Sequence, residues 1–79
     1  MKLAQAVGKR LKELLFEKGM TQYRLVKVTC LNEKTVSDLI KGKTSDVKLS
    51  TIYLIAQALD MSLIEFFDSP LFDKFNIEI

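Results

Sequence analysis

The stretch that most constrains the fold of this chain is residues 21–42, where two short helical patterns are separated by a tight corner. Apolar residues recur at helical spacing on both sides of the corner, as Leu25 and Val28 before it and as Val36, Leu39 and Ile40 after it. Residues of the types that begin and end helices lie at the boundaries of the two patterns: Thr21, Asn32 and Gly42. We therefore expect two short helices that meet at a sharp turn.

The rest of the chain is also helical in pattern. Apolar periodicity predicts three further helices, over residues 3–18, 49–59 and 63–67. Ser62, followed three residues later by Glu65, is a capping box that begins the last of them. Only three glycines and one proline interrupt the 79 residues. The sequence thus predicts an all-α fold, a compact five-helix domain over residues 1–70 followed by a short apolar tail over residues 71–79.

The tail alternates apolar and polar residues over residues 75–79, which predicts a short strand. Two alternatives are open for its large apolar side chains. Phe72 and Phe75 can fold back onto the core of their own domain. Alternatively, the tail can pair with the same segment of a second subunit or contact a different partner protein.

Composition argues against several classes of protein. The chain has no histidine and a single cysteine, so we expect no metal site and no internal disulfide. It has no glycine-rich phosphate loop and no nucleophile beside a base, so we expect neither an enzyme nor a cofactor. No apolar stretch approaches the roughly 20 residues of a membrane span, and the chain begins without the apolar region of a signal peptide. We therefore expect a cytoplasmic protein without membrane contact.

Charge is distributed unevenly along the chain. Residues 1–48 contain eleven of the twelve Lys and Arg and five of the ten Asp and Glu, which gives them a formal charge of +6. Residues 49–79 contain one basic and five acidic residues, which gives −4. A positive field on one side of a small domain favours binding to a polyanion, although ordinary solvated helix faces can have the same composition.

The outer face of the second central helix carries a row of polar side chains: Glu33, Lys34, Ser37, Asp38 and Lys41. A polar rod on the second of two helices joined by a short turn is typical of a helix-turn-helix that reads the DNA major groove. Lys34 can donate to guanine O6 or N7, and Glu33 can accept from cytosine N4. Asp38 can accept from a base in the same way, or it can pair with Lys34 or Lys41 on its own helix.

Several short motifs occur in a characteristic order between residues 7 and 67: Gly19-Met20-Thr21-Gln22, Leu25, Leu31-Asn32, Lys41-Gly42 and a Leu-rich ending over residues 58–67. In order and spacing they resemble the lambda-repressor-like helix-turn-helix domains, the Cro/cI or xenobiotic-response-element type of bacterial and phage regulators. The chain departs from that family at the corner, where Cys30 replaces the usual glycine. Since this position often requires a positive φ, we expect either a strained Cys30 or an altered turn. No base or metal partner for a reactive Cys30 thiol is visible in the sequence.

The resemblance implies a sequence-specific regulator of transcription that binds duplex DNA as a homodimer, acts as a repressor, and places a recognition helix over about residues 32–41 in the major groove. The positions that it implies for base contacts are Asn32, Glu33, Lys34, Ser37 and Asp38. The positions that it implies for phosphate contacts are Thr21, Gln22, Lys41, Lys43 and Thr44. The alternative is an antitoxin-like or other protein-interaction module that has the same fold and contacts its partner through the apolar tail.

Overall fold

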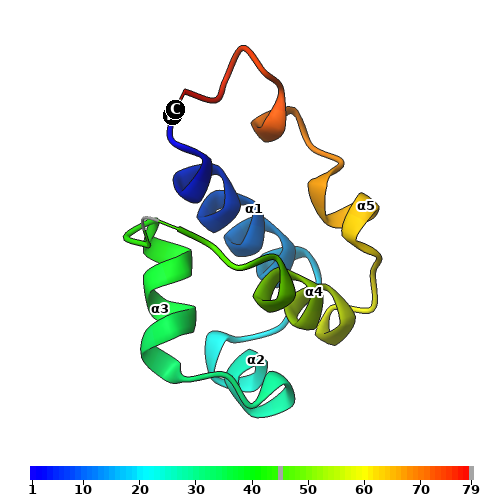
Figure 1. The fold of residues 1–79 in the computed structure, drawn as a ribbon. Helices are drawn as coiled ribbons and strands as arrows, with labels where there is room; N and C mark the ends of the chain where they lie inside the picture. Colours follow the sequence, from blue (N-terminus) through cyan, green and yellow to red (C-terminus); the bar gives the residue numbers. More distant parts are fainter. Residues whose placement is uncertain (45, 79) are drawn as a thin grey trace.

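The helices expected from the periodicity are all present in the computed structural model, which describes residues 1–44 and 46–78 (Figure 1). Within these ranges the chain forms five α-helices and one short 3-10 helix, which gives the predicted all-α class. Each helix lies within one or two residues of its expected position, and the 3-10 helix was not expected. In chain order the elements are α1 (Leu3–Glu17), α2 (Gln22–Thr29), α3 (Glu33–Lys41), α4 (Leu49–Ala58), α5 (Leu63–Phe67) and η1 (Pro70–Phe72).

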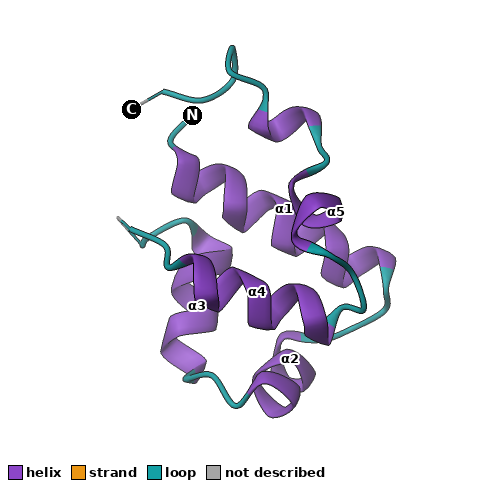
Figure 2. Cartoon of the chain, turned by 45° about the vertical axis from the view of Figure 1, so that its right-hand side comes forward, coloured by secondary structure: helices purple, strands orange, loops and turns teal. Residues whose placement is uncertain are grey.

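The five α-helices pack together in one group (Figure 2), and each contributes side chains to one hydrophobic core. The buried side chains of the described residues are apolar, in agreement with the helical stripes in the sequence. The largest fully buried ones come from every helix: Leu11 and Leu14 from α1, Leu25 from α2, Val36 and Leu39 from α3, Ile55 from α4, and Phe66 from α5. Because the core lies between the helices, the polar rows remain on the outside.

Gly8 is a point where the backbones of α1 and α3 approach each other closely. A Cβ atom at this position would lie 2.9 Å from the carbonyl oxygen of Ile40 and 3.3 Å from the amide nitrogen of Gly42, and it would also meet the carbonyl oxygen of Leu39. Only glycine lets two helices pack at this separation. The close approach fixes the position of α3 on α1.

Two local devices hold α5 in place. Ser62 Oγ accepts from the Glu65 amide at 3.1 Å, and Glu65 Oε1 accepts from the Ser62 amide at 3.0 Å, so the predicted capping box is confirmed. At the other end, Arg10 Nε donates to the carbonyl oxygen of Phe66 at 2.6 Å, and its guanidinium also donates to that of Glu65 at 2.8 Å. Arg10 therefore belongs to the scaffold, not to the basic surface.

The predicted strand in the tail is wrong for the described residues. Residues 74–76 form a turn, and only an isolated parallel bridge joins Lys2 to Glu78. The chain curls because η1 follows directly after α5 and because Asn76 Nδ2 donates to the Pro70 carbonyl oxygen at 2.7 Å. The Glu78 amide also donates to the Met1 carbonyl oxygen at 2.9 Å, so Glu78 lies beside the start of the chain (Figure 2). Ile79, the last residue of the predicted strand, lies outside the described residues.

The two phenylalanines of the tail behave differently from each other. Phe72 folds back onto the core, with its ring 4.9 Å from that of Phe67 in an edge-to-face arrangement. Phe75 is 86% exposed. The first alternative therefore holds for Phe72, whereas Phe75 remains on the surface.

Candidate nucleic-acid interface

The two central helices begin and end at the residues that the sequence indicated. Thr21 Oγ1 accepts from the Arg24 amide at 3.1 Å at the start of α2, and Asn32 Oδ1 accepts from the Lys34 amide at 2.8 Å at the start of α3. Gly42 ends α3 in the left-handed conformation, with φ of 69°. These side-chain caps satisfy amides that would otherwise lack partners at the start of each helix.

Two alternatives were open for the corner between α2 and α3, a strained Cys30 or an altered turn. The structure shows a strained Cys30. Cys30 is left-handed, with φ of 59° and ψ of 20°. For a residue other than glycine, this conformation costs roughly 1–2 kcal/mol. Thr29 supports the turn, because its hydroxyl donates to the Leu25 carbonyl at 2.7 Å and accepts from the Leu31 amide at 3.3 Å. The Cys30 thiol is exposed.

The outer face of α3 presents the predicted base-contact side chains to solvent. Asn32, Glu33 and Lys34 are exposed at the start of the helix, and Ser37 and Asp38 are half-buried one turn later. Thr35 is exposed beside them and is absent from the predicted set, although its place next to Lys34 in the helical sequence could have indicated it. The first two turns of α3 therefore form one continuous polar surface.

Lys34 and Asp38 form an ion pair on this surface. Lys34 Nζ lies 2.8 Å from Asp38 Oδ2 across one helical turn, so Asp38 pairs with Lys34 rather than with Lys41. The hydrogen bond from Lys34 lowers the pKa of the Asp38 carboxyl, and the same bond raises the pKa of the Lys34 ammonium. Both groups are therefore charged at neutral pH. In the absence of DNA, the Lys34 ammonium is thus paired with the Asp38 carboxylate.

The predicted phosphate-contact residues form two groups at the two ends of the helix pair (Figure 1). Thr21 and Gln22 are exposed at the start of α2. Lys41 and Lys43 are exposed and Thr44 is half-buried at the end of α3. Ser45, which follows them in the predicted loop, lies outside the described residues. Along the helix pair, the predicted phosphate contacts thus lie at the start of α2 and at the end of α3, with the polar surface of α3 between them in the chain.

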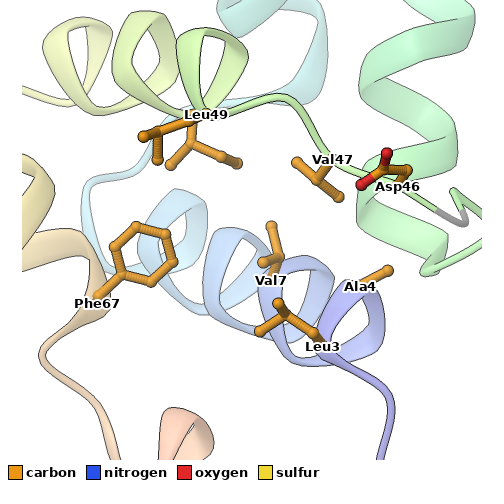
Figure 3. A pocket seen from close by; sticks show the side chains of 8 residues that line it. Leu3, Ala4, Val7, Asp46, Val47, Leu49 and Phe67 are labelled. Carbon is orange, nitrogen blue, oxygen red and sulfur yellow. The ribbon is translucent and has the colours of Figure 1, made fainter. Parts of the chain in front are cut away.

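An apolar cavity of about 190 Å³ lies apart from this surface, between the start of α1, the start of α4 and Phe67 (Figure 3). The side chains around it are apolar except for Asp46. In the described residues we find no group of three or more potential ligands that could hold a metal ion. No helix in the same ranges has the length and apolar character needed to cross a membrane.

Comparison with known proteins gives a consistent picture. A family model for the Cro/C1-type HTH DNA-binding domain matches residues 10–70. The crystal structure of the prophage Lp1 protein 11 is 28% identical with a TM-score of 0.82, and the match covers 94% of this chain and 99% of that chain. No curated protein matches.

Two restriction-modification controller proteins are also similar in structure. C.AhdI from Aeromonas hydrophila is 33% identical with a TM-score of 0.74, over 81% of this chain and 96% of that chain. A point mutant of C.Esp1396I is 28% identical with a TM-score of 0.76, over 85% and 86% of the two chains. The similarity therefore extends beyond the helix pair to most of the domain.

Proposed function

Because this chain belongs to the Cro/C1-type helix-turn-helix DNA-binding family, we propose that it represses transcription by inserting α3 into the major groove of a specific duplex site. Its general role as a DNA-binding transcriptional regulator follows from the family and from the controller proteins that it resembles. We further propose which side chains contact the bases and how the protein assembles on DNA.

The observation that carries the proposal is the polar surface of α3, together with the predicted phosphate contacts at the start of α2 and the end of α3. With its side chains an α-helix is roughly 10–12 Å across, which matches the width of about 12 Å of the major groove, and the nine residues of α3 form a rod roughly 13–14 Å long. With the start of the helix in the groove, Lys34 reaches guanine O6 or N7, and Glu33 accepts from cytosine N4. Thr21, Gln22, Lys41 and Lys43 then contact phosphates and set the register of the helix.

An exposed apolar surface supports assembly as a homodimer. Tyr53 and Leu54 on α4 are 49% and 42% exposed, and Ile64 on the neighbouring α5 is 84% exposed. Pairing of this surface with a second copy would present two α3 helices to half-sites about 34 Å apart on one side of the duplex. Sedimentation equilibrium checks this: Ile64→Asp should shift the protein towards monomer without lowering its helix content.

One observation supports the alternative that the chain contacts another protein through its tail. Phe75 is 86% exposed in the tail, and no element of the described residues covers it. Removal of the residues after Asp73, which leaves Phe72 on the core, separates the possibilities. Loss of a co-purifying protein with DNA binding retained would support the interaction module, whereas loss of self-association alone would support a tail-mediated dimer.

Selection of bound sequences from a random duplex pool tests the proposed function directly. We expect one enriched sequence, with affinity that falls steeply as salt rises. Lys34→Met should reduce discrimination at one base pair of that sequence. Lys18→Met removes the same charge from an exposed position at the end of α1 and serves as the control. No enrichment, together with no salt-dependent binding, would contradict the proposal.

A further inference from the structure

A basic hollow lies between the first three turns of α1 and the end of α3, where two lysines of α1 adjoin Lys41, one of the predicted phosphate contacts. It has a volume of about 390 Å³, and its lining includes Lys9 and Lys12 from α1 and Lys41 from α3. We propose that this hollow holds a backbone phosphate of bound duplex DNA, so that α1 is a further phosphate-binding element. The proposal rests on the proposed function.

The lining of the hollow is positive and contains no carboxylate. None of its residues is Asp or Glu, and the ion pairs formed within the described ranges involve none of the three lysines. The N-terminal ammonium of Met1 also lines the hollow, and it lies 3.9 Å from Glu78 Oε1. Lys34 on the reading surface is different, because Asp38 lies 2.8 Å from it. Three ammonium groups around one hollow favour an anion, and DNA presents its phosphate diesters next to any helix that lies in its groove.

Lys9 and Lys12 lie next to a close backbone contact between α1 and the end of α3. Gly8, directly before Lys9, brings the backbone of α1 against the carbonyl oxygen of Ile40 and the amide of Gly42. Lys9 and Lys12 therefore keep a constant position relative to Lys41, and only their side chains must be ordered when an anion binds. This lowers the entropic cost of binding compared with lysines on a loop.

The place of the hollow along α3 indicates which part of the DNA it meets. Lys41 lies in the last turn of the helix, about two turns beyond Lys34. When the first turns contact base edges, the end of a helix this long reaches the wall of the groove, where the phosphates lie. Gln5 adds a neutral donor to the lining, because its Oε1 accepts from the Lys2 amide at 2.9 Å and its amide nitrogen remains available as a donor.

Paired double variants test the proposal. Lys9→Met/Lys12→Met removes two positive charges at the hollow, and Lys18→Met/Lys74→Met removes two from exposed positions elsewhere. The affinity of each for the selected duplex is measured by fluorescence anisotropy between about 50 and about 200 mM salt. We expect the slope of log affinity against log salt to fall by about one in magnitude for the first double variant. The control should keep the slope of the wild type, and the selected sequence should be the same for all three proteins.

Equal slopes for the two double variants would overturn the proposal while leaving DNA binding intact. Absence of salt-dependent binding by the wild type would instead overturn the proposed function, and the phosphate assignment with it. Backbone amide NMR of the wild type gives a second readout that does not depend on the folding of any variant. Addition of duplex should shift the amides of residues 5–12 more than that of Lys18, and equal shifts at both places would count against the hollow. Inorganic phosphate alone should shift the amides of residues 5–12 less than duplex does; shifts of the same size would overturn the assignment to a DNA phosphate, because the hollow would then be a site for any small anion.

Discussion

Replacement of Gly8 by alanine improves helix propensity but worsens the packing between α1 and α3. We expect the packing term to be the larger, so that the free energy of unfolding falls. In a helix interior alanine is favoured over glycine by about 1 kcal/mol, so propensity alone predicts a more stable protein. The new methyl group, however, would lie 2.9 Å from the Ile40 carbonyl oxygen, 3.3 Å from the Gly42 amide, and in conflict with the Leu39 carbonyl. These are backbone atoms of α3 and of Gly42 directly after it, which cannot rotate away as the end of a flexible side chain can.

The size of the effect follows from these two terms. Inserting a methyl group into a packed contact costs typically about 1–3 kcal/mol, and a conflict with three backbone atoms belongs in the upper half of that range, at about 2–3 kcal/mol. After subtraction of the propensity gain, we expect Gly8→Ala to be destabilised by about 1–2 kcal/mol. For a domain of this size, this corresponds to a fall in Tm of roughly 5–15 °C.

Urea denaturation followed by far-UV circular dichroism measures the change. Glu13→Ala, at an exposed position of the same helix, is the matched control and should differ from the wild type by less than about 0.5 kcal/mol. If Gly8→Ala is as stable as the wild type, or more stable, the close contact between α1 and α3 is not the constraint described above.

Three other variants probe the scaffold and the reading surface. Arg10→Met removes both guanidinium hydrogen bonds to the end of α5 and should cost about 1.5–3 kcal/mol in urea denaturation, with unchanged affinity of the folded protein for DNA. Hydrogen bonds from Ser62 lower the pKa of Glu65, so the capping box stabilises the fold above the ordinary carboxyl pKa and this contribution is lost on acidification. Between about pH 5 and about pH 3 the urea midpoint of the wild type should therefore fall more than that of Glu65→Gln; parallel curves would refute this. Asp38→Asn should raise affinity for unrelated duplex in anisotropy titrations, because Lys34 loses its ion-pair partner; an unchanged affinity would refute it.

Features that depend on neighbours in the sequence could be predicted from the sequence. The helix starts at Thr21, Asn32 and Ser62 follow from side chains that bond amides two or three residues away. The positive φ of Cys30 could also be anticipated, as one of two alternatives, because the turn geometry imposes it on whichever residue occupies the corner. These points depend on local chemistry and not on tertiary contacts.

Features that depend on distant contacts could not be predicted. Arg10 belongs to the scaffold because it meets carbonyl oxygens 55 and 56 residues away, and no local pattern separates it from the surface lysines beside it. The alternation in the tail resembled a strand, but a strand needs a partner along its whole length. The single bridge between Lys2 and Glu78 and the bond from Asn76 to Pro70 curl the tail instead.

The candidate site could be predicted from the sequence only in part. Helical spacing placed Lys34 and Asp38 on one face, but it allowed Asp38 to pair with Lys41 equally well. The choice depends on side-chain rotamers, which the sequence pattern does not contain. The basic hollow of α1 and α3 was also invisible in the sequence, since Lys12 and Lys41 are far apart along the chain and the contact at Gly8 brings them together.

The central claim is that the start of α3 reads base edges in the major groove. The most direct measurement compares wild type and Lys34→Met on the selected duplex and on duplexes that differ from it by one base pair. For the wild type, each mismatch within the site should weaken binding by about 1–3 kcal/mol. For Lys34→Met, the penalty should disappear at one base pair and persist at the others. If the wild type bound selected and mismatched duplexes equally, or if Lys34→Met kept every penalty, α3 would not read the sequence as described.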